Sequence, residues 1–63
     1  MIEKYPLLNE PGRTMFVFSK LGKFYGNIVK DATNKTPAKL MFETPKYDSV
    51  GELKADFPPA EAV

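Results

Sequence analysis

The residues that could do chemistry in this chain are serines, carboxylates and lysines, because it contains no histidine and no cysteine. A nucleophilic serine would therefore need a lysine or a carboxylate as its base. Of the serines, Ser49 begins an S-x-x-E pattern that a helix cap explains, and Ser19 follows an apolar strand pattern. Glu52 and Asp56 lie four residues apart, a spacing typical of the solvated face of a helix. These residues predict a protein that is not an enzyme.

Metal and cofactor sites are not expected either. The lack of cysteine and histidine removes thiolate zinc sites and the commonest transition-metal ligand. No D-x-D-x-D-G calcium loop is present. The glycines are too scattered to form a phosphate-binding loop; they are Gly12, Gly22, Gly26 and Gly51. We therefore expect no cofactor, no metal and no small-molecule substrate.

One segment has the residue types that bind single-stranded nucleic acid. The sequence KFYGNIVK (residues 23–30) places two aromatic residues between lysines. Aromatic rings stack on bases and lysines neutralise phosphates. The segment resembles the sheet motif of RNA-recognition and cold-shock domains, in which a basic residue precedes a glycine-flanked aromatic strand. Phe24 replaces a glycine of that motif and Asn27 replaces an aromatic residue. The resemblance implies single-stranded nucleic-acid binding as an alternative function.

The size and charge of the chain favour a binding role. A chain of 63 residues without disulfides has little core, so a partner or self-association would stabilise it. The segment 13–46 carries seven lysine or arginine residues against two acidic ones, a net charge of +5. Such a basic centre suits an anionic partner, although attraction between the oppositely charged ends of a small fold is the favoured explanation. No signal peptide and no membrane-spanning run is evident, so we expect a cytoplasmic protein.

The elements that must position these residues begin with a β-hairpin. The segments 13–19 and 23–30 have the alternation of strands. A three-residue loop (20–22) is predicted between them, with Gly22 at positive φ. This register pairs Phe18 with Phe24 and places Gly26 under Phe16. It gathers four apolar side chains on one buried face: Phe16, Phe18, Phe24 and Ile28.

The rest of the chain predicts a third strand and one helix. Segment 38–44 forms the strand, with Leu40 and Phe42 on the buried face. Ser49 and Glu52 then form a capping box, and Leu53 and Phe57 follow at helical spacing. The predicted fold class is α+β: a three-stranded antiparallel meander with one short C-terminal helix on one face and an extended N-terminal arm. The predicted boundaries are an arm at 1–12, one domain at 13–57 and a flexible tail at 58–63.

The second face of the predicted sheet is the candidate binding site. One short helix covers only one face, and an exposed apolar face is typical of protein interaction sites. Alternatively, Tyr5, Leu7 and Leu8 of the arm cover it. The predicted partner-binding residues are Met15, Val17, Tyr25, Val29 and Met41, with Lys23, Lys30 and Lys39 as a basic rim.

The function predicted from these features is protein–protein interaction without catalysis. The chain would be a self-associating subunit, or a binder or inhibitor of a larger protein. In size and composition it resembles the small accessory proteins of phages and mobile elements. The alternative is a single-stranded nucleic-acid-binding protein that uses strand 23–30.

Overall fold

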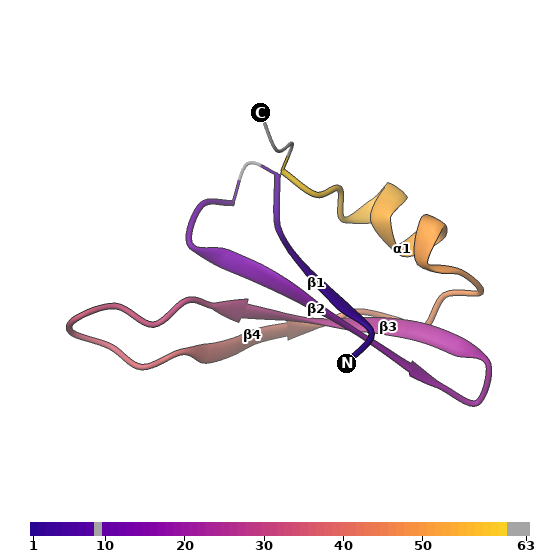
Figure 1. Cartoon of the computed structure of the whole chain (residues 1–63), viewed down its shortest axis with the longest axis horizontal. Coiled ribbons are helices and arrows are strands. Elements are labelled where there is room, and N and C mark those ends of the chain that lie inside the picture. The colour runs from indigo at the N-terminus through magenta and orange to yellow at the C-terminus, as the bar shows by residue number, and fades with distance from the viewer. Residues whose placement is uncertain (9, 61–63) are drawn as a thin grey trace.

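The computed structural model describes residues 1–8 and 10–60, which form one antiparallel sheet and one helix. The sheet has four strands in the order β1-β2-β3-β4 (Figure 1). The strands are Glu3–Pro6 (β1), Arg13–Lys20 (β2), Lys23–Lys30 (β3) and Lys39–Glu43 (β4), and helix α1 spans Val50–Asp56. The α+β class and the antiparallel sheet are confirmed, but the prediction of three strands is wrong by one.

The additional strand lies in the predicted N-terminal arm. Strand β1 pairs antiparallel with β2, so that Tyr5 stands opposite Met15. Tyr5 and Leu7 are buried in the core, whereas Leu8 is exposed. The arm therefore extends the sheet at its edge and does not cover the second face. Pro6, which has no N–H, is tolerated there because its nitrogen faces away from β2, so no hydrogen bond between β1 and β2 is lost.

The hairpin between β2 and β3 has a two-residue loop, so the predicted three-residue loop is wrong. Lys20 stands opposite Lys23, which leaves only Leu21 and Gly22 in the turn. The φ angles of these residues are 51° and 79°. Positive φ at both central positions is typical of a type I′ turn, whose twist matches that of the flanking strands. The positive φ predicted for Gly22 is confirmed, but Leu21 also adopts one.

This shift of one residue exchanges the two faces of β2, whereas the faces of β3 stay as predicted. Met15 and Val17, predicted to face outward, are fully buried at 0% exposure and pack with Ile28. Phe16 and Phe18, predicted to be in the core, lie on the opposite face. The physical reason is the two-residue period of a strand: changing the pairing by one residue changes which side chains share a face.

The space above Gly26 is filled by Met15, not by the predicted Phe16. Val17 stands directly opposite Gly26, and Met15 reaches across so that a β-carbon on residue 26 would collide with its sulfur. Two hydrogen bonds also join Gly26 to Thr44, the residue that follows β4. The Gly26 N–H donates to Thr44 Oγ1 at 2.8 Å, and the Thr44 N–H donates to the Gly26 carbonyl at 2.8 Å.

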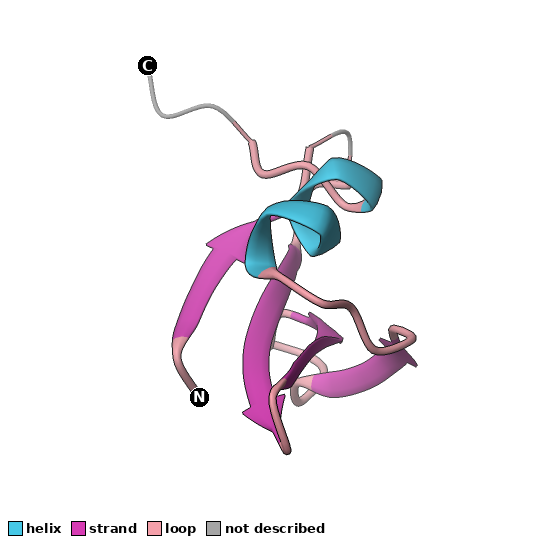
Figure 2. Ribbon diagram, turned by 90° about the vertical axis from the view of Figure 1, so that its right-hand side faces the viewer, coloured by secondary structure: helices cyan, strands magenta, loops and turns pink. Residues whose placement is uncertain are grey.

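Helix α1 packs on one face of the sheet, as Figure 2 shows. Ser49 Oγ accepts the Glu52 N–H at 3.1 Å, which confirms the predicted N-cap. The Glu52 carboxylate accepts the N–H of Asp48 at 3.0 Å, one residue before the position expected for a capping box. Leu53 is fully buried beneath the helix. The core therefore lies between the sheet and α1, and comprises Tyr5, Leu7, Met15, Val17, Ile28 and Leu53.

The first strand is fixed to the end of the helix by polar contacts. The Tyr5 hydroxyl donates to the Phe57 carbonyl at 2.7 Å. Lys54 forms an ion pair with Glu3 at 2.9 Å, and its Nζ lies 5.5 Å from the centre of the Tyr5 ring. These contacts join residues about fifty positions apart in the sequence. They fix β1 as part of the domain.

The segment after the helix returns to β1. Leu8 donates its N–H to the Pro58 carbonyl at 2.9 Å, and Ala60 donates its N–H to the Pro6 carbonyl at 2.8 Å. The predicted flexible tail spans 58–63. Its first three residues take part in this pairing, and residues 61–63 lie outside the described residues.

Candidate functional site

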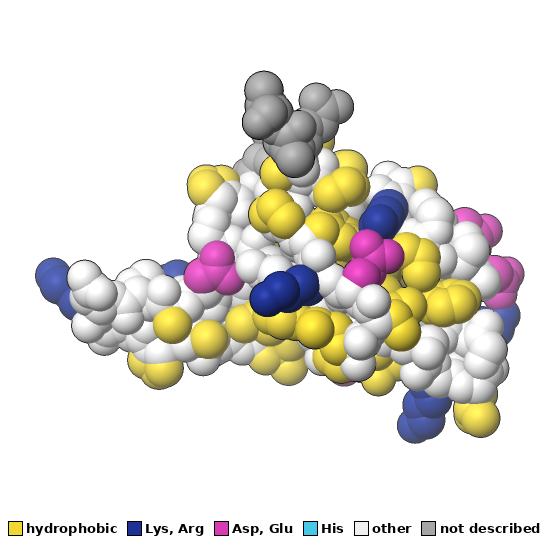
Figure 3. All heavy atoms as spheres, viewed as in Figure 1, with side chains coloured by type: hydrophobic (Ala, Val, Ile, Leu, Met, Phe, Trp, Pro, Cys, Tyr) yellow, Lys and Arg dark blue, Asp and Glu magenta, His cyan; other side chains and the backbone are white. Residues whose placement is uncertain are grey.

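The sheet face opposite α1 is the candidate site, because no described helix or strand packs on it (Figures 1 and 2). Its apolar side chains form what we call the open face: Phe16, Phe18, Tyr25, Val29 and Leu40. Leu40 is 55% exposed and the other four are partly exposed. In Figure 3, hydrophobic side chains run along the border of the molecule on the side away from α1. The open face is therefore an apolar surface in contact with solvent.

Two aromatic rings form the end of the open face nearest the hairpin turn. Phe18 and Tyr25 stand directly opposite each other on β2 and β3. Their ring centroids are 5.6 Å apart and their planes differ by 23°, a stacked arrangement. Contact between the two rings restricts their rotamers, which limits the side-chain entropy lost on binding.

The predicted apolar site residues are divided between the two faces. Tyr25 and Val29 lie on the open face, whereas Met15 and Val17 are buried beneath α1 and out of reach of a partner. Met41 is 42% exposed and lies at an irregularity of β4. Whether Tyr25, Val29 and Met41 bind a partner stays a prediction.

The predicted lysine rim is not continuous. Lys23 lies at the turn end of β3 and pairs with Asp48. The hydrogen bond and the negative charge of Asp48 raise the pKa of Lys23 above its ordinary value. Lys30 and Lys39 stand opposite each other at the other end of β3, and both are exposed. The three lysines therefore occupy two separate ends of the sheet.

Phe16, Phe18 and Leu40 are the open-face residues that sequence reasoning missed; Leu40, predicted to be on the buried face, pairs with Val29 on the open one. The missing signal was the turn: two-residue type I′ loops favour Asn-Gly or Asp-Gly, and here the loop is Leu21-Gly22. With a two-residue loop, the register places both phenylalanines on the face away from α1. In that register Met15 and Val17 form the apolar core face with Ile28.

One polar side chain interrupts the middle of the open face. Asn27 stands opposite Phe16 on β2 and opposite Glu43 on β4. Its side-chain oxygen Oδ1 is buried and has no hydrogen-bond partner among the described residues. A buried acceptor without a donor is destabilising, by about 1–3 kcal/mol. Asn27 is therefore poorly satisfied in the isolated chain.

A shallow groove lies beside Tyr25. Its lining residues are Lys20, Tyr25, Glu43, Thr44, Pro45 and Lys46. Neither Lys20 nor Lys46 forms an ion pair within the described part of the chain. The groove thus brings together a stacked aromatic ring, two lysines and the carboxylate of Glu43.

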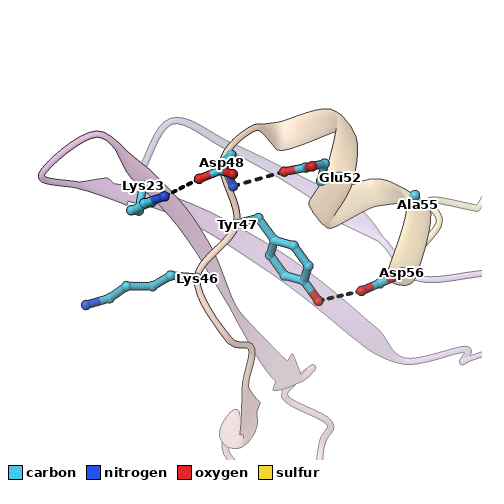
Figure 4. Close-up of a pocket in the computed structure, with 7 residues that line it drawn as sticks. All are labelled: Lys23, Lys46, Tyr47, Asp48, Glu52, Ala55 and Asp56. Carbon is cyan, nitrogen blue, oxygen red and sulfur yellow. Dashed lines mark hydrogen bonds and ion pairs between the residues drawn. The ribbon is translucent and has the colours of Figure 1, made fainter.

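A second pocket lies between α1 and the segment 46–48, beside the start of β3 (Figure 4), and its polar groups bind one another. Lys23 contacts Asp48, and the Tyr47 hydroxyl donates to Asp56 at 2.8 Å. That hydrogen bond raises the pKa of Tyr47 above its ordinary value. Lys46 points away from the other side chains in this view. The polar side chains of this pocket therefore link α1 to β3, and most of them already have a hydrogen-bond or ion-pair partner.

The groups considered for catalysis also have structural partners. Ser49 caps the helix, and the carboxylates of Glu52 and Asp56 accept hydrogen bonds from Asp48 and Tyr47. Within residues 1–8 and 10–60, no three acidic side chains gather in a way that could hold a metal ion. Nor does the described chain contain a helix long and apolar enough to cross a membrane.

Comparisons of this chain with protein families, curated proteins and solved structures found no match. Its function is therefore inferred from the open face and the residues at its rim. That surface combines rings, aliphatic side chains and a few charges on a rigid sheet. These are the components of a binding surface.

Proposed function

We propose that this chain is a non-enzymatic protein–protein interaction module that binds through its open face. The observation that carries the proposal is the uncovered apolar surface formed by Phe16, Phe18, Tyr25, Val29 and Leu40. Contiguous apolar surface is costly in water, and on a folded protein it usually marks an interaction site. The chain would act as a self-associating subunit, or as a binder or inhibitor of a larger protein.

The composition and rigidity of the open face support this proposal. Phenylalanine and tyrosine are enriched at protein interfaces. The rings of Phe18 and Tyr25 are already stacked, so little rotamer freedom remains to be lost on binding. The absence of cysteine fits a reducing environment, and we place the protein in the cytoplasm as part of the same proposal.

The second candidate is binding of single-stranded nucleic acid. The observation that favours it is the groove in which Tyr25 lies beside Lys20 and Lys46. The stacked Phe18 and Tyr25 rings could hold a base, and the two lysines could contact phosphates. Glu43 lies in the same groove and repels phosphate, which favours the protein partner.

The test is site-specific photo-crosslinking in lysate of the native cell. The photoreactive residue p-benzoylphenylalanine would replace Phe18 or Tyr25, and the same residue at Lys35, in an exposed loop, is the matched control. We expect protein adducts from positions 18 and 25 but not from 35, with the adduct identified by mass spectrometry. Equal adducts at all three positions, or none from the open face, would contradict the proposal.

The alternative is separated by its dependence on salt. Binding to an oligo(dT) strand should weaken steeply as salt increases if phosphates supply the affinity. Tyr25→Ala should weaken that binding further through loss of stacking. Nucleotide adducts from position 25, together with this salt dependence, would show that the open face binds nucleic acid and not a protein.

A further inference from the structure

A row of four side chains crosses the middle of the open face, one from each strand. Lys4 pairs with Phe16, Phe16 with Asn27, and Asn27 with Glu43. Directly paired residues of antiparallel strands point to the same face. The row therefore has a positive charge at the β1 edge and a negative charge at the β4 edge. Neither Lys4 nor Glu43 has an ion-pair partner among the described residues.

This row is complementary to itself. Two sheets that pack face to face lie about 10 Å apart. A two-fold axis parallel to the strands, passing between β2 and β3, places β1 of one copy over β4 of the other. Lys4 then lies over Glu43 of the second copy at both edges, and Phe16 lies over its Asn27. A two-fold axis perpendicular to the strands would instead place each Lys4 over its own equivalent, which is repulsive.

We propose that the occupant of the open face is a second copy of this chain, packed face to face about a two-fold axis parallel to the strands. The inference rests on the proposed function and names its partner. The Phe18 ring of each copy lies over Tyr25 of the other, so the open faces form a second core between two sheets. A chain with one small core gains most from such an arrangement.

The test is exchange of the edge charges. Sedimentation velocity and light scattering over a concentration series should give a dimer for the wild-type chain. Lys4→Glu and Glu43→Lys should each weaken dimerisation at least about tenfold, because each turns two attractive contacts into repulsive ones. The double variant Lys4→Glu/Glu43→Lys should return to within about threefold of the wild type. Lys35→Glu, the same charge change in the exposed loop 31–38, is the control and should have no effect.

A structural readout accompanies the binding data. Circular dichroism verifies that each variant is folded, and Lys4→Gln and Glu43→Gln replace any variant that is not. In a mixture of labelled and unlabelled chains, isotope-filtered NOEs should connect Phe16 of one copy with Asn27 of the other. These contacts are specific to this axis.

Several outcomes would overturn the inference. They are a wild-type chain that is monomeric throughout, a dimer that ignores both single reversals, or a double variant that fails to recover. If the chain is monomeric but crosslinks to another protein through position 18 or 25, only the second copy is excluded and the proposed function stands. A monomer that binds oligo(dT) instead would support the nucleic-acid alternative.

Discussion

The sulfur of Met15 occupies the space where a β-carbon on residue 26 would stand, so Gly26 and Met15 fit only as a pair. Gly26→Ala should therefore lower the free energy of unfolding by about 1–3 kcal/mol, because the fully buried Met15 would have to move. Urea titration followed by circular dichroism measures the change.

A second glycine provides the matched control. A β-carbon on Gly51 would meet only Ser49 Oγ at 3.7 Å, an ordinary contact. Gly51→Ala should raise the free energy of unfolding by about 0.5–1 kcal/mol, since alanine favours the helix. Met15→Ala should reduce the cost of Gly26→Ala when the two are combined. Additive effects in that double variant would contradict the packing described here.

The turn residue Leu21 is the next site where one substitution should have a clear sign. Its φ is positive, a conformation that costs residues other than glycine about 1–2 kcal/mol. Its side chain is 93% exposed, so little packing would be lost on replacement. Leu21→Asn should raise the free energy of unfolding by about 0.5–1 kcal/mol, measured by urea titration. Gly22→Ala should lower it, and a stabilising Gly22→Ala would argue against the two-residue turn.

The same turn explains which part of the hairpin could be predicted from the sequence. The alternation in 13–19 and 23–30 specifies two strands, and Gly22 specifies a turn between them. Alternation alone does not say which of two sets of apolar side chains is buried, because both faces of each strand carry large residues. Which set is buried depends on Leu21 adopting a positive φ, because that conformation allows the two-residue turn. Packing in the folded protein here overrides the local preference of leucine for a negative φ.

The hydroxyl of Tyr5 should contribute to stability in a pH-dependent way. Burial, and then the charges of Glu3 and Tyr47, raise the pKa of Tyr5 above its ordinary value. The unfolded chain therefore loses the phenolic proton at lower pH than the folded chain. This contribution is fully present below about pH 10 and is lost as the pH rises through the folded-state pKa.

Tyr5→Phe isolates this effect. The variant should lose about 1 kcal/mol at neutral pH, because the hydrogen bond to the Phe57 carbonyl is removed. Its free energy of unfolding should then decline less steeply than that of the wild type above about pH 10. Tyr25→Phe is the control, since the Tyr25 hydroxyl makes no hydrogen bond within the described chain. Parallel declines in wild type and Tyr5→Phe would disprove the buried role of the hydroxyl.

The two faces of the sheet should respond oppositely to a new charge. Val17 is fully buried, so Val17→Asp should abolish folding, because an unpaired buried carboxylate costs more than a chain of this size can supply. Tyr25→Asp should leave a folded chain that no longer binds through the open face. Proton–nitrogen NMR spectra of both variants distinguish the outcomes. A well-dispersed spectrum for Val17→Asp would mean that Val17 faces solvent.

The candidate site was predicted only in part. The sequence predicts the faces of β3 correctly: Ile28 lies in the core, and Tyr25 and Val29 lie on the opposite face. The three-residue loop predicts Phe16 in the core because it places Phe16 opposite Gly26, on the same face as Phe24 and Ile28; the two-residue turn places it opposite Asn27. The row from Lys4 to Glu43 could not be foreseen, because it requires β1 and β4 to be aligned through two intervening strands.

The pairing of residues 6–8 with 58–60 determines when the fold can be completed. Synthesis proceeds from the N-terminus, so residues 6–8 must wait for residues 58–60, which are made about fifty positions later. Until Phe57 and Pro58 are made, the Tyr5 hydroxyl and the Leu8 amide have no partners in the chain, and Leu7 has no cover. We expect a nascent chain that is interrupted before the helix to remain open and prone to degradation. Folding would then be a single late event.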